Sequence, residues 1–229
     1  MFVYMLESIG RQVLVSVESC GRIVMLFIQT LCYLRAKPKM RHILQQAVHL
    51  GVDSLPIVLL TILFTGMVIT LQTANEFIKY GAQSSVGGIV AIAMLRELAP
   101  VLTGVVVAGR VGGAIAAEIG SMKVTEQIDA LRVMAVDPIQ YLVVPRFLAC
   151  IIMVPVLVIF ADVIGTLGGY LVATLYSGIG SFTYFNSIKT FAVVHDVMAG
   201  LVKAMFFGGI IAIIGCYKTC RIEKIRSAT

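Results

Sequence analysis

The stretch VDSLPIVLLTILFTGMVITLQ, residues 52–72, decides how the rest of the chain is interpreted. Its one charged residue, Asp53, lies at the start, and every later residue of the stretch is uncharged. About 20 predominantly apolar residues are needed for an α-helix to cross the hydrocarbon core of a bilayer. Pro56 lies near the beginning of the stretch, where a helix tolerates a missing N–H. The stretch therefore predicts a transmembrane helix.

Three further apolar regions follow it, at residues 86–117, 147–176 and 197–217. The first of these is interrupted only by Arg96, Glu97 and Arg110. It is too long for one untilted crossing and too short for two crossings joined by a loop. Two interpretations fit: a short re-entrant piece that ends near Pro100 and is followed by a full helix, or one long tilted helix.

The composition of the whole chain also indicates a membrane protein. Hydrophobic residues make up 59% of the 229 residues, charged residues only 13%, and the mean hydropathy is +0.98. Soluble domains average about 25% charged residues, so this chain has too few charges to cover a surface that faces water. We therefore expect residues 1–229 to form a single all-α domain, a polytopic integral membrane helical bundle.

The formal net charge of +6 raises nucleic acid as a partner, but the positions of the charges argue against it. Lys and Arg concentrate beside the apolar regions, where they set topology and contact anionic lipid headgroups. Along the chain, the segments outside the apolar regions are alternately rich and poor in Lys and Arg, beginning and ending with a rich one. This alternation predicts four crossings with both termini in the cytoplasm.

The N-terminal residues 5–34 have a helical period but carry many charges. Glu7, Arg11, Glu18 and Arg22 oppose the apolar side of this segment. Charges placed so densely make crossing expensive, which favours an interfacial helix along the cytoplasmic leaflet. Residues 35–50 follow as a basic linker, and residues 218–229 form a basic tail.

Residues 118–138 are polar enough to leave the hydrocarbon and are expected to form a cytoplasmic loop. Val124, Ile128 and Leu131 follow one another at the spacing of a helix face, and Pro138 closes the pattern. We therefore predict a short amphipathic helix in this loop.

Charges within the apolar regions are the first candidates for function, because each costs about 2.5–3.5 kcal/mol at a helix centre. They are Arg96, Glu97, Arg110, Asp162 and Lys203. Structural ion pairing is the alternative interpretation, and Lys203 is an available partner for Glu97. Small residues at four-residue spacing predict close helix packing or a dimer interface. The positions concerned are Gly109, Gly113, Gly165, Gly169, Gly200 and Gly208.

The chain has no GxxxxGK[ST] phosphate-binding loop, no HExxH and no GxSxG. Its five cysteines form no CxxC pair and do not cluster with histidine, so we predict no metal site. We therefore expect no enzymatic activity and no cofactor in this chain. Any ATP and Mg²⁺ would be bound by a partner.

Longer patterns resemble a known family. Residues 95–131 read LRELAPVLTGVVVAGRVGGAIAAEIGSMKVTEQIDAL, and they are followed in order by DPIQYLVVPR, ADVIGTLGGY and GLVKAMFFGGIIAIIGCYK. Together these pieces closely resemble the MlaE-type permeases of lipid-transporting ABC systems. The resemblance runs from about Leu50 to Lys218.

The resemblance implies a homodimeric permease in the cell inner membrane that moves phospholipid between the inner and outer membranes. It also implies two cytoplasmic ABC ATPase subunits and an external lipid-binding protein with MCE domains. By analogy, Arg96, Glu97 and Lys203 lie near the lipid pathway, and residues 118–138 form the coupling helix that inserts into the ATPase. The coupling candidates are Glu118, Lys123, Val124, Glu126, Ile128, Asp129, Leu131 and Arg132.

One departure leaves alternatives open. Members of the family usually continue beyond the position of Tyr217 through a glycine-rich loop into a final transmembrane helix, whereas this sequence reads CRIEKIRSAT there. On this basis we expect a shortened permease, and the alternative is a non-transporting membrane scaffold or a degraded remnant. A third class, an ion channel or ion-coupled carrier, would use Arg96, Glu97, Asp162 and Lys203 as a relay.

Overall fold

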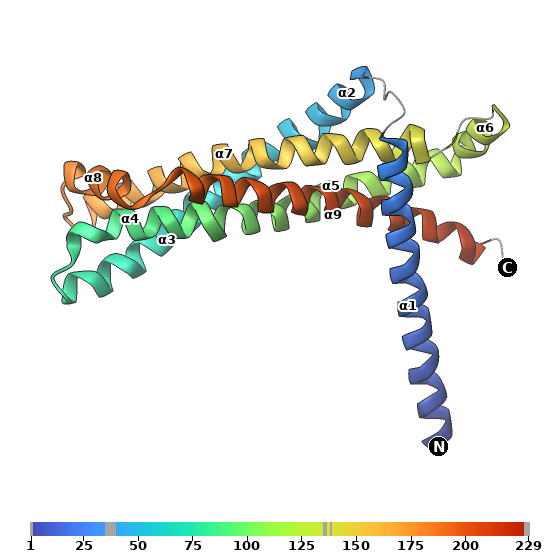
Figure 1. Cartoon of the computed structure of the whole chain (residues 1–229), viewed down its shortest axis with the longest axis horizontal. Coiled ribbons are helices and arrows are strands. Elements are labelled where there is room, and N and C mark those ends of the chain that lie inside the picture. The colour runs from blue at the N-terminus through green and yellow to red at the C-terminus, as the bar shows by residue number, and fades with distance from the viewer. Residues whose placement is uncertain (1, 35–39, 135–136, 138, 227–229) are drawn as a thin grey trace.

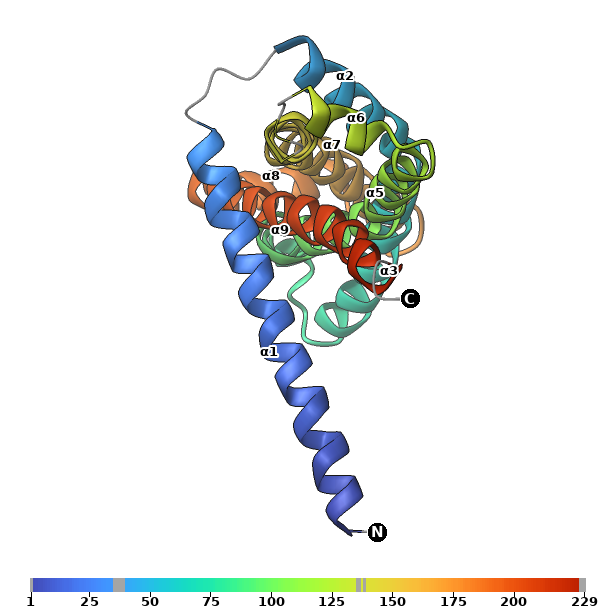
Figure 2. The ribbon, with the colours of Figure 1, turned by 90° about the vertical axis from the view of Figure 1, so that its right-hand side faces the viewer.

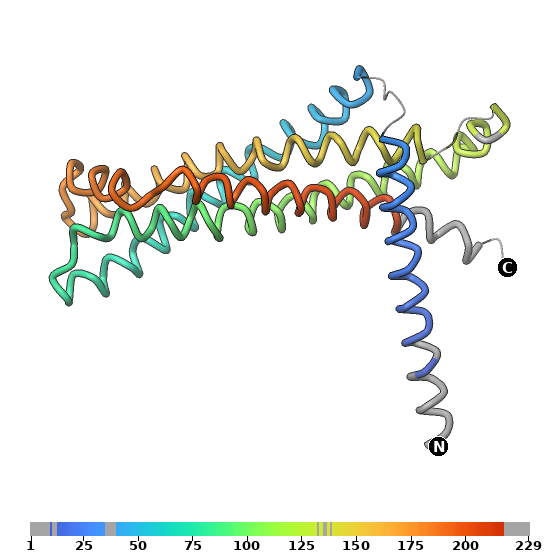
Figure 3. The backbone as a smooth tube through the Cα atoms, viewed as in Figure 1, coloured from blue at the N-terminus to red at the C-terminus, as the bar shows by residue number. Residues whose placement is uncertain are grey.

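A computed structural model describes the backbone of residues 2–34, 40–134, 137 and 139–226. It describes the side chains of residues 10, 13–34, 40–131, 133–134, 137 and 139–217, which Figure 3 draws in colour. Within these residues the chain is helical almost throughout and contains no strand, so the all-α expectation is confirmed.

The elements share one pattern, in which long helices are joined by short turns. In chain order they are α1 (Phe2–Tyr33), α2 (Met40–Gly51), η1 (Val52–Ser54), α3 (Leu55–Lys79), η2 (Gln83–Ser85), α4 (Val86–Ala93), η3 (Met94–Leu98), α5 (Ala99–Val124), α6 (Gln127–Val133), η4 (Ile139–Val143), α7 (Val144–Leu175), α8 (Ser181–Phe191) and α9 (Val194–Arg226). Of these, η3 and η4 are π-helical.

The part of the chain that the structure describes holds five helical segments long and apolar enough to cross a membrane. They are Val13–Tyr33, Met40–Lys79, Gln83–Val124, Ile139–Leu175 and Val194–Tyr217. The chain is therefore a multi-pass membrane protein. Four of the segments contain the apolar regions expected from the sequence, and the fifth lies within α1.

Helices α3, α5, α7 and α9 run along one common axis and form the body of the molecule (Figure 1). Helix α7 packs against both α3 and α9, and α5 packs against α9. A Cβ added at Gly66 of α3 would lie 2.1 Å from the carbonyl oxygen of Gly165 in α7. The backbones of these two helices thus touch, which is how small residues hold helices together in lipid.

The long apolar region at residues 86–117 does not fold back. Helix α4, the π-helical η3 and α5 form one continuous helical path that ends at Val124 (Figure 1). The re-entrant interpretation is therefore wrong, and the long helix is observed. Pro100 lies at the second position of α5, where its missing N–H does not break the path. Gln83–Val124 comprises 42 residues, and at ~1.5 Å per residue it is about twice as long as the hydrocarbon core is thick.

The expected linker at residues 35–50 is only partly a linker. Residues 35–39 lie outside the described part, but Met40–Gly51 forms helix α2 and packs against α7. Ile43, Ala47 and Leu50 turn toward the core at helical spacing, which the basic residues around them had hidden. The basic tail also begins inside a helix, because the α9 backbone continues to Arg226.

Helix α1 lies across the axis of the bundle instead of along it (Figures 1 and 2). It contacts α9 and η4 at the end of the molecule where α6 lies. This direction is the one that a helix lying along a membrane surface would take beside an upright bundle. The interfacial position of residues 5–34 remains a prediction.

Helix α8 covers the opposite end of the bundle (Figure 1). Its Tyr184 is fully buried beside Tyr170 and Phe185, and the hydroxyl donates to the carbonyl oxygen of Thr166 at 3.3 Å. Burial raises the pKa of Tyr184 to about 12. The hydroxyl therefore stays protonated at any physiological pH.

Candidate functional site

The first candidate site begins with a local consequence of Pro100. In an α-helix the N–H of this residue would donate to the carbonyl oxygen of Arg96, but proline has no N–H. The helix widens into a π-helical turn at Met94–Leu98, where the N–H of Ala99 donates to the carbonyl oxygen of Met94. Lys203 of α9 instead donates its Nζ to the Arg96 carbonyl oxygen at 2.9 Å.

Two ion pairs join this π-helical turn to the beginning of α9. Lys203 Nζ lies 2.7 Å from Glu97 Oε1, which is the pairing expected from the sequence. Arg96 Nε lies 3.6 Å from Asp196 Oδ1. Asp196, Gly200 and Lys203 follow one another at helical spacing, so one face of α9 meets the turn. We call Arg96, Glu97, Asp196 and Lys203 the charge cluster.

Gly200 brings the two helices of the charge cluster into contact. A Cβ at this position would lie 2.3 Å from the carbonyl oxygen of Leu95, a distance that real side chains do not adopt. Glycine therefore allows α9 to approach the backbone of the turn, and this approach brings Lys203 within reach of Arg96 and Glu97.

The charge cluster is paired and also accessible. The side chains of Arg96, Glu97 and Lys203 are 51%, 61% and 40% exposed, while Asp196 is 11% exposed. Ion pairing reduces the cost of charges in an apolar segment, and exposure leaves part of each group available to a polar ligand. The arrangement therefore leaves charged groups accessible to a polar ligand.

Asp162, the fourth charged candidate, lies elsewhere. It is on α7 and only 7% exposed, and its Oδ1 has no hydrogen-bond partner among the described residues. No contact joins Asp162 to the charge cluster in the described part of the chain. The structure thus separates Asp162 from the site proposed for it.

The second candidate site, residues 118–138, differs from the single amphipathic helix that the sequence predicted. Glu118, Lys123 and Val124 belong to the end of α5, and the separate helix α6 begins only at Gln127. Between them Glu126 adopts a left-handed φ of 56°, and its N–H donates to the Lys123 carbonyl oxygen. This turn breaks the helical register, so the expected apolar face is divided between two helices.

The coupling candidates therefore differ in exposure. Val124 is 78% exposed, whereas Ile128 packs against the hydrophobic core and Leu131 is half-buried. Glu126 and Asp129 are exposed, Lys123 is half-buried, and the side chain of Arg132 lies outside the described residues. Helix α6 projects from the end of the bundle, as Figure 1 shows.

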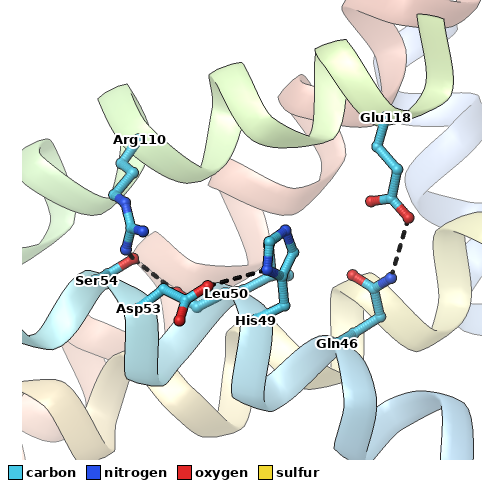
Figure 4. Close-up of polar contacts among 7 residues, drawn as sticks. All are labelled: Gln46, His49, Leu50, Asp53, Ser54, Arg110 and Glu118. Carbon is cyan, nitrogen blue, oxygen red and sulfur yellow. Dashed lines mark hydrogen bonds and ion pairs between the residues drawn. The ribbon is translucent and has the colours of Figure 1, made fainter. Parts of the chain in front are cut away.

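Polar contacts connect α2 and η1 to α5 (Figure 4). Arg110 Nη1 donates to Ser54 Oγ at 3.0 Å, and Gln46 Nε2 donates to Glu118 Oε1 at 3.5 Å. His49 Nδ1 lies 3.0 Å from Asp53 Oδ2 on the α2 side of this interface. These contacts hold the α6 end of α5 against the neighbouring helices.

The glycines chosen from their spacing fall into two groups. Added Cβ atoms would meet neighbouring helices at 2.3 Å for Gly165, 2.5 Å for Gly169, 2.3 Å for Gly200 and 2.6 Å for Gly208. Gly109 and Gly113 would meet nothing within 4 Å. They line an open groove of about 580 Å³ between α5 and α9.

Sequence reasoning missed two residues that the structure places in these sites. Asp196 directly precedes the apolar residues 197–217, and Arg146 directly precedes the apolar residues 147–176. In the structure, Asp196 pairs with Arg96 and Arg146 Nη2 lies 2.9 Å from Glu118 Oε2. Their positions just outside the apolar regions are what concealed them.

The fold is that of a multi-pass helical membrane protein. The sequence model described as Permease MlaE matches residues 43–227. The chain therefore belongs to the MlaE permease family.

Three relatives illustrate the range of the family. A probable ABC transporter permease protein of Synechocystis is 48% identical over 183 residues, which cover 80% of this chain and 70% of the relative. The intermembrane phospholipid transport system permease protein MlaE of Haemophilus influenzae is 40% identical over 90% of this chain and 80% of its own length. The chloroplastic protein Trigalactosyldiacylglycerol 1 of Arabidopsis thaliana is 40% identical over 80% of this chain and 52% of its own.

Proposed function

We propose that this chain is the permease subunit of an ABC-type transporter that moves phospholipid between inner and outer membranes. The observation that carries the proposal is the charge cluster, which is paired, accessible and built on a π-helical turn in an apolar segment. A phospholipid headgroup carries charges that such a cluster can receive, while the apolar helices around it contact the acyl chains. The name of the Haemophilus influenzae relative supports the choice of phospholipid.

The energy would come from a separate ATPase subunit that binds ATP and Mg²⁺. Support for this step comes from α5, which follows η3 without a break and ends at the turn into α6. A displacement of α6 by the ATPase would be passed along this one helix to Glu97 and Arg96. The chain itself would then need no catalytic group.

The proposed assembly contains two copies of this chain, cytoplasmic ABC ATPase subunits and an MCE-domain lipid-binding protein in the inner membrane. Both termini and α6 would lie on the cytoplasmic side. The open groove beside Gly109 and Gly113 supports the second copy, because small residues allow the backbone of another helix to approach closely.

The first test is phospholipid transfer by the assembled complex. The chain is co-expressed with its ATPase and MCE partners, reconstituted in lipid nanodiscs, and labelled phospholipid is followed with and without ATP. We expect transfer that depends on ATP. A complex that assembles but transfers nothing would support the scaffold alternative, and ATP turnover that ignores lipid would support it further.

The second test concerns α6. Replacing Glu126 and Asp129 together by lysine is expected to weaken co-purification of the ATPase while the protein stays in the membrane. Glu126→Gly is the matched control, because glycine adopts the left-handed φ of 56° without strain and removes only one carboxylate. Unchanged co-purification of the double lysine variant would count against the coupling role.

A further inference from the structure

A polar cavity lies beneath the α6 end of the bundle, away from the charge cluster, and shares Glu118 with the second candidate site. It has a volume of about 220 Å³, far more than the ~10–15 Å³ that one water molecule needs. Its walls come from α2, α5, η4 and α7. The residues that line it are His42, Gln45, Gln46, Glu118, Met122, Tyr141, Leu142, Pro145 and Arg146.

Arg146 supplies the donors of this cavity. Its side chain is 2% exposed, and Nη2 lies 2.9 Å from Glu118 Oε2. Its Nε and Nη1 are buried and have no hydrogen-bond partner among the described residues. Buried N–H groups of a guanidinium are costly to leave unpaired, so this arginine is suited to meet an acceptor that the described residues do not provide.

Gln46 and Glu118 supply acceptors in the same cavity. Gln46 Oε1 is buried and accepts no hydrogen bond from the described residues, whereas Glu118 Oε2 is already ion-paired with Arg146 Nη2 at 2.9 Å. A simple anion would satisfy Arg146 but would lie beside the carboxylate of Glu118. A simple cation would satisfy the carboxylate of Glu118 but would lie beside the guanidinium of Arg146. A group that carries both a phosphate and a cation with N–H groups would pair with both Arg146 and Glu118.

We propose that this cavity binds a phosphoethanolamine group, with its phosphate on Arg146 and its ammonium on Glu118 and Gln46. The primary ammonium has three N–H donors, enough for Gln46 Oε1 and the two carboxylate oxygens of Glu118. The quaternary ammonium of choline has no N–H and could not make them. This proposal does not depend on transport.

The position of the cavity indicates a lipid as the source of that group. Arg146 directly precedes the apolar residues 147–176, and Glu118 directly follows the apolar residues 86–117. Both side chains therefore lie where an apolar segment meets a polar one, the position at which a lipid headgroup is expected. The site is also separate from the charge cluster, since Glu118 and Glu97 are roughly 30 Å apart along the helix at 1.5 Å per residue.

The test is lipid retention by the full chain, purified in detergent and studied by native mass spectrometry. Phosphatidylethanolamine, phosphatidylcholine and phosphatidylglycerol with identical acyl chains are added at equal concentrations. We expect phosphatidylethanolamine to be retained preferentially. Equal retention of the three lipids would overturn the proposal, and so would preference for phosphatidylglycerol.

Variants of the cavity test the residues. Arg146→Gln is expected to weaken retention of phosphatidylethanolamine by about tenfold, because hydrogen bonds to a charged group are lost. Gln46→Leu keeps the ion pair between Arg146 and Glu118 and is expected to cost about fivefold, so it serves if Arg146→Gln fails to fold. Lys189→Gln is the control and should leave retention unchanged, since Lys189 is exposed on α8 at the opposite end of the bundle and does not line the cavity.

A last arm distinguishes the two sources of the group. Soluble glycerophosphoethanolamine at millimolar concentration should displace the bound lipid if the headgroup is what the cavity recognises. Binding of the soluble compound by a chain that retains no phosphatidylethanolamine would overturn the membrane source. Failure of both to bind would overturn the site, whatever the result of the transfer assay.

Discussion

At the scale of single residues, Lys203 has the most contacts of functional interest. Its Nζ donates to the carboxylate of Glu97 and to the carbonyl oxygen of Arg96. The carboxylate is a side chain that mutation can remove, whereas the carbonyl oxygen belongs to the backbone and cannot accept from Pro100, which has no N–H. One side chain thus completes an ion pair and a helix backbone.

This double role predicts unequal effects of two neutral substitutions. Lys203→Gln should lower the thermal midpoint of the purified chain more than Glu97→Gln, because only the first leaves the Arg96 carbonyl without its ammonium donor. Both should reduce lipid transfer by the complex. Thermal unfolding in detergent measures the first effect. Equal midpoints for the two variants would show that the carbonyl contact contributes nothing.

Tyr184 makes a prediction about pH. Its native pKa of about 12 exceeds the ordinary value of 10.0, so the protonated form is favoured by folding. The stabilisation from this group is complete below pH 10.0 and is lost as pH rises through about 12. A tyrosinate absorbance titration should show one tyrosine that ionises near pH 12 in the native chain and is missing in Tyr184→Phe. Identical titration curves would contradict the burial argument.

At the scale of helices, the glycines of α5 and α9 show how spacing alone can mislead. Gly200 and Gly109 both occur in small-residue patterns, yet only Gly200 is in contact with another helix. The pattern predicts a face that can pack closely, and it does not say whether a partner is present.

The two positions therefore form a matched pair. Gly200→Ala should destabilise the chain by about 1–3 kcal/mol, because its Cβ would clash with a backbone carbonyl that cannot move aside. Gly109→Ala should be neutral or should stabilise the single chain by about 0.5–1 kcal/mol through higher helix propensity. Denaturation in mixed micelles would compare them, and a larger loss for Gly109→Ala would refute this assignment.

At the scale of the whole molecule, the crosswise direction of α1 is the main topological question. Val13–Tyr33 has the length and composition to cross a membrane, but α1 does not run along the bundle (Figure 1). An interfacial α1 leaves four crossings and agrees with the alternation of Lys and Arg. A crossing α1 would make five.

Labelling with a membrane-impermeant maleimide distinguishes the two topologies. In a cysteine-free background, single cysteines are placed at residues 13, 32 and 123. If α1 is interfacial, residues 13 and 32 should both be labelled from the same side as residue 123. Labelling of residue 13 from the opposite side would show that α1 crosses the membrane.

The sequence by itself determined the class, the family resemblance and the main apolar segments, and it indicated Lys203 as an available partner for Glu97. Segment length and apolar composition are local properties, so they can be inferred from the position of a charge such as Asp53. An ion pair requires only two residues of opposite charge, such as Glu97 and Lys203. The sequence also predicted one short amphipathic helix in the loop at residues 118–138, but Val124 belongs to α5 and not to the helix that carries Ile128 and Leu131.

Only the tertiary structure decided the rest. The path of residues 86–117 depended on how a π-helical turn accommodates Pro100, and the roles of Arg146 and Asp196 depended on helices distant in sequence. Helical periodicity gives the direction of a side chain around its own axis but not the neighbour that it meets. For that reason the sequence indicated only part of the charge cluster and gave no indication of the cavity at Arg146.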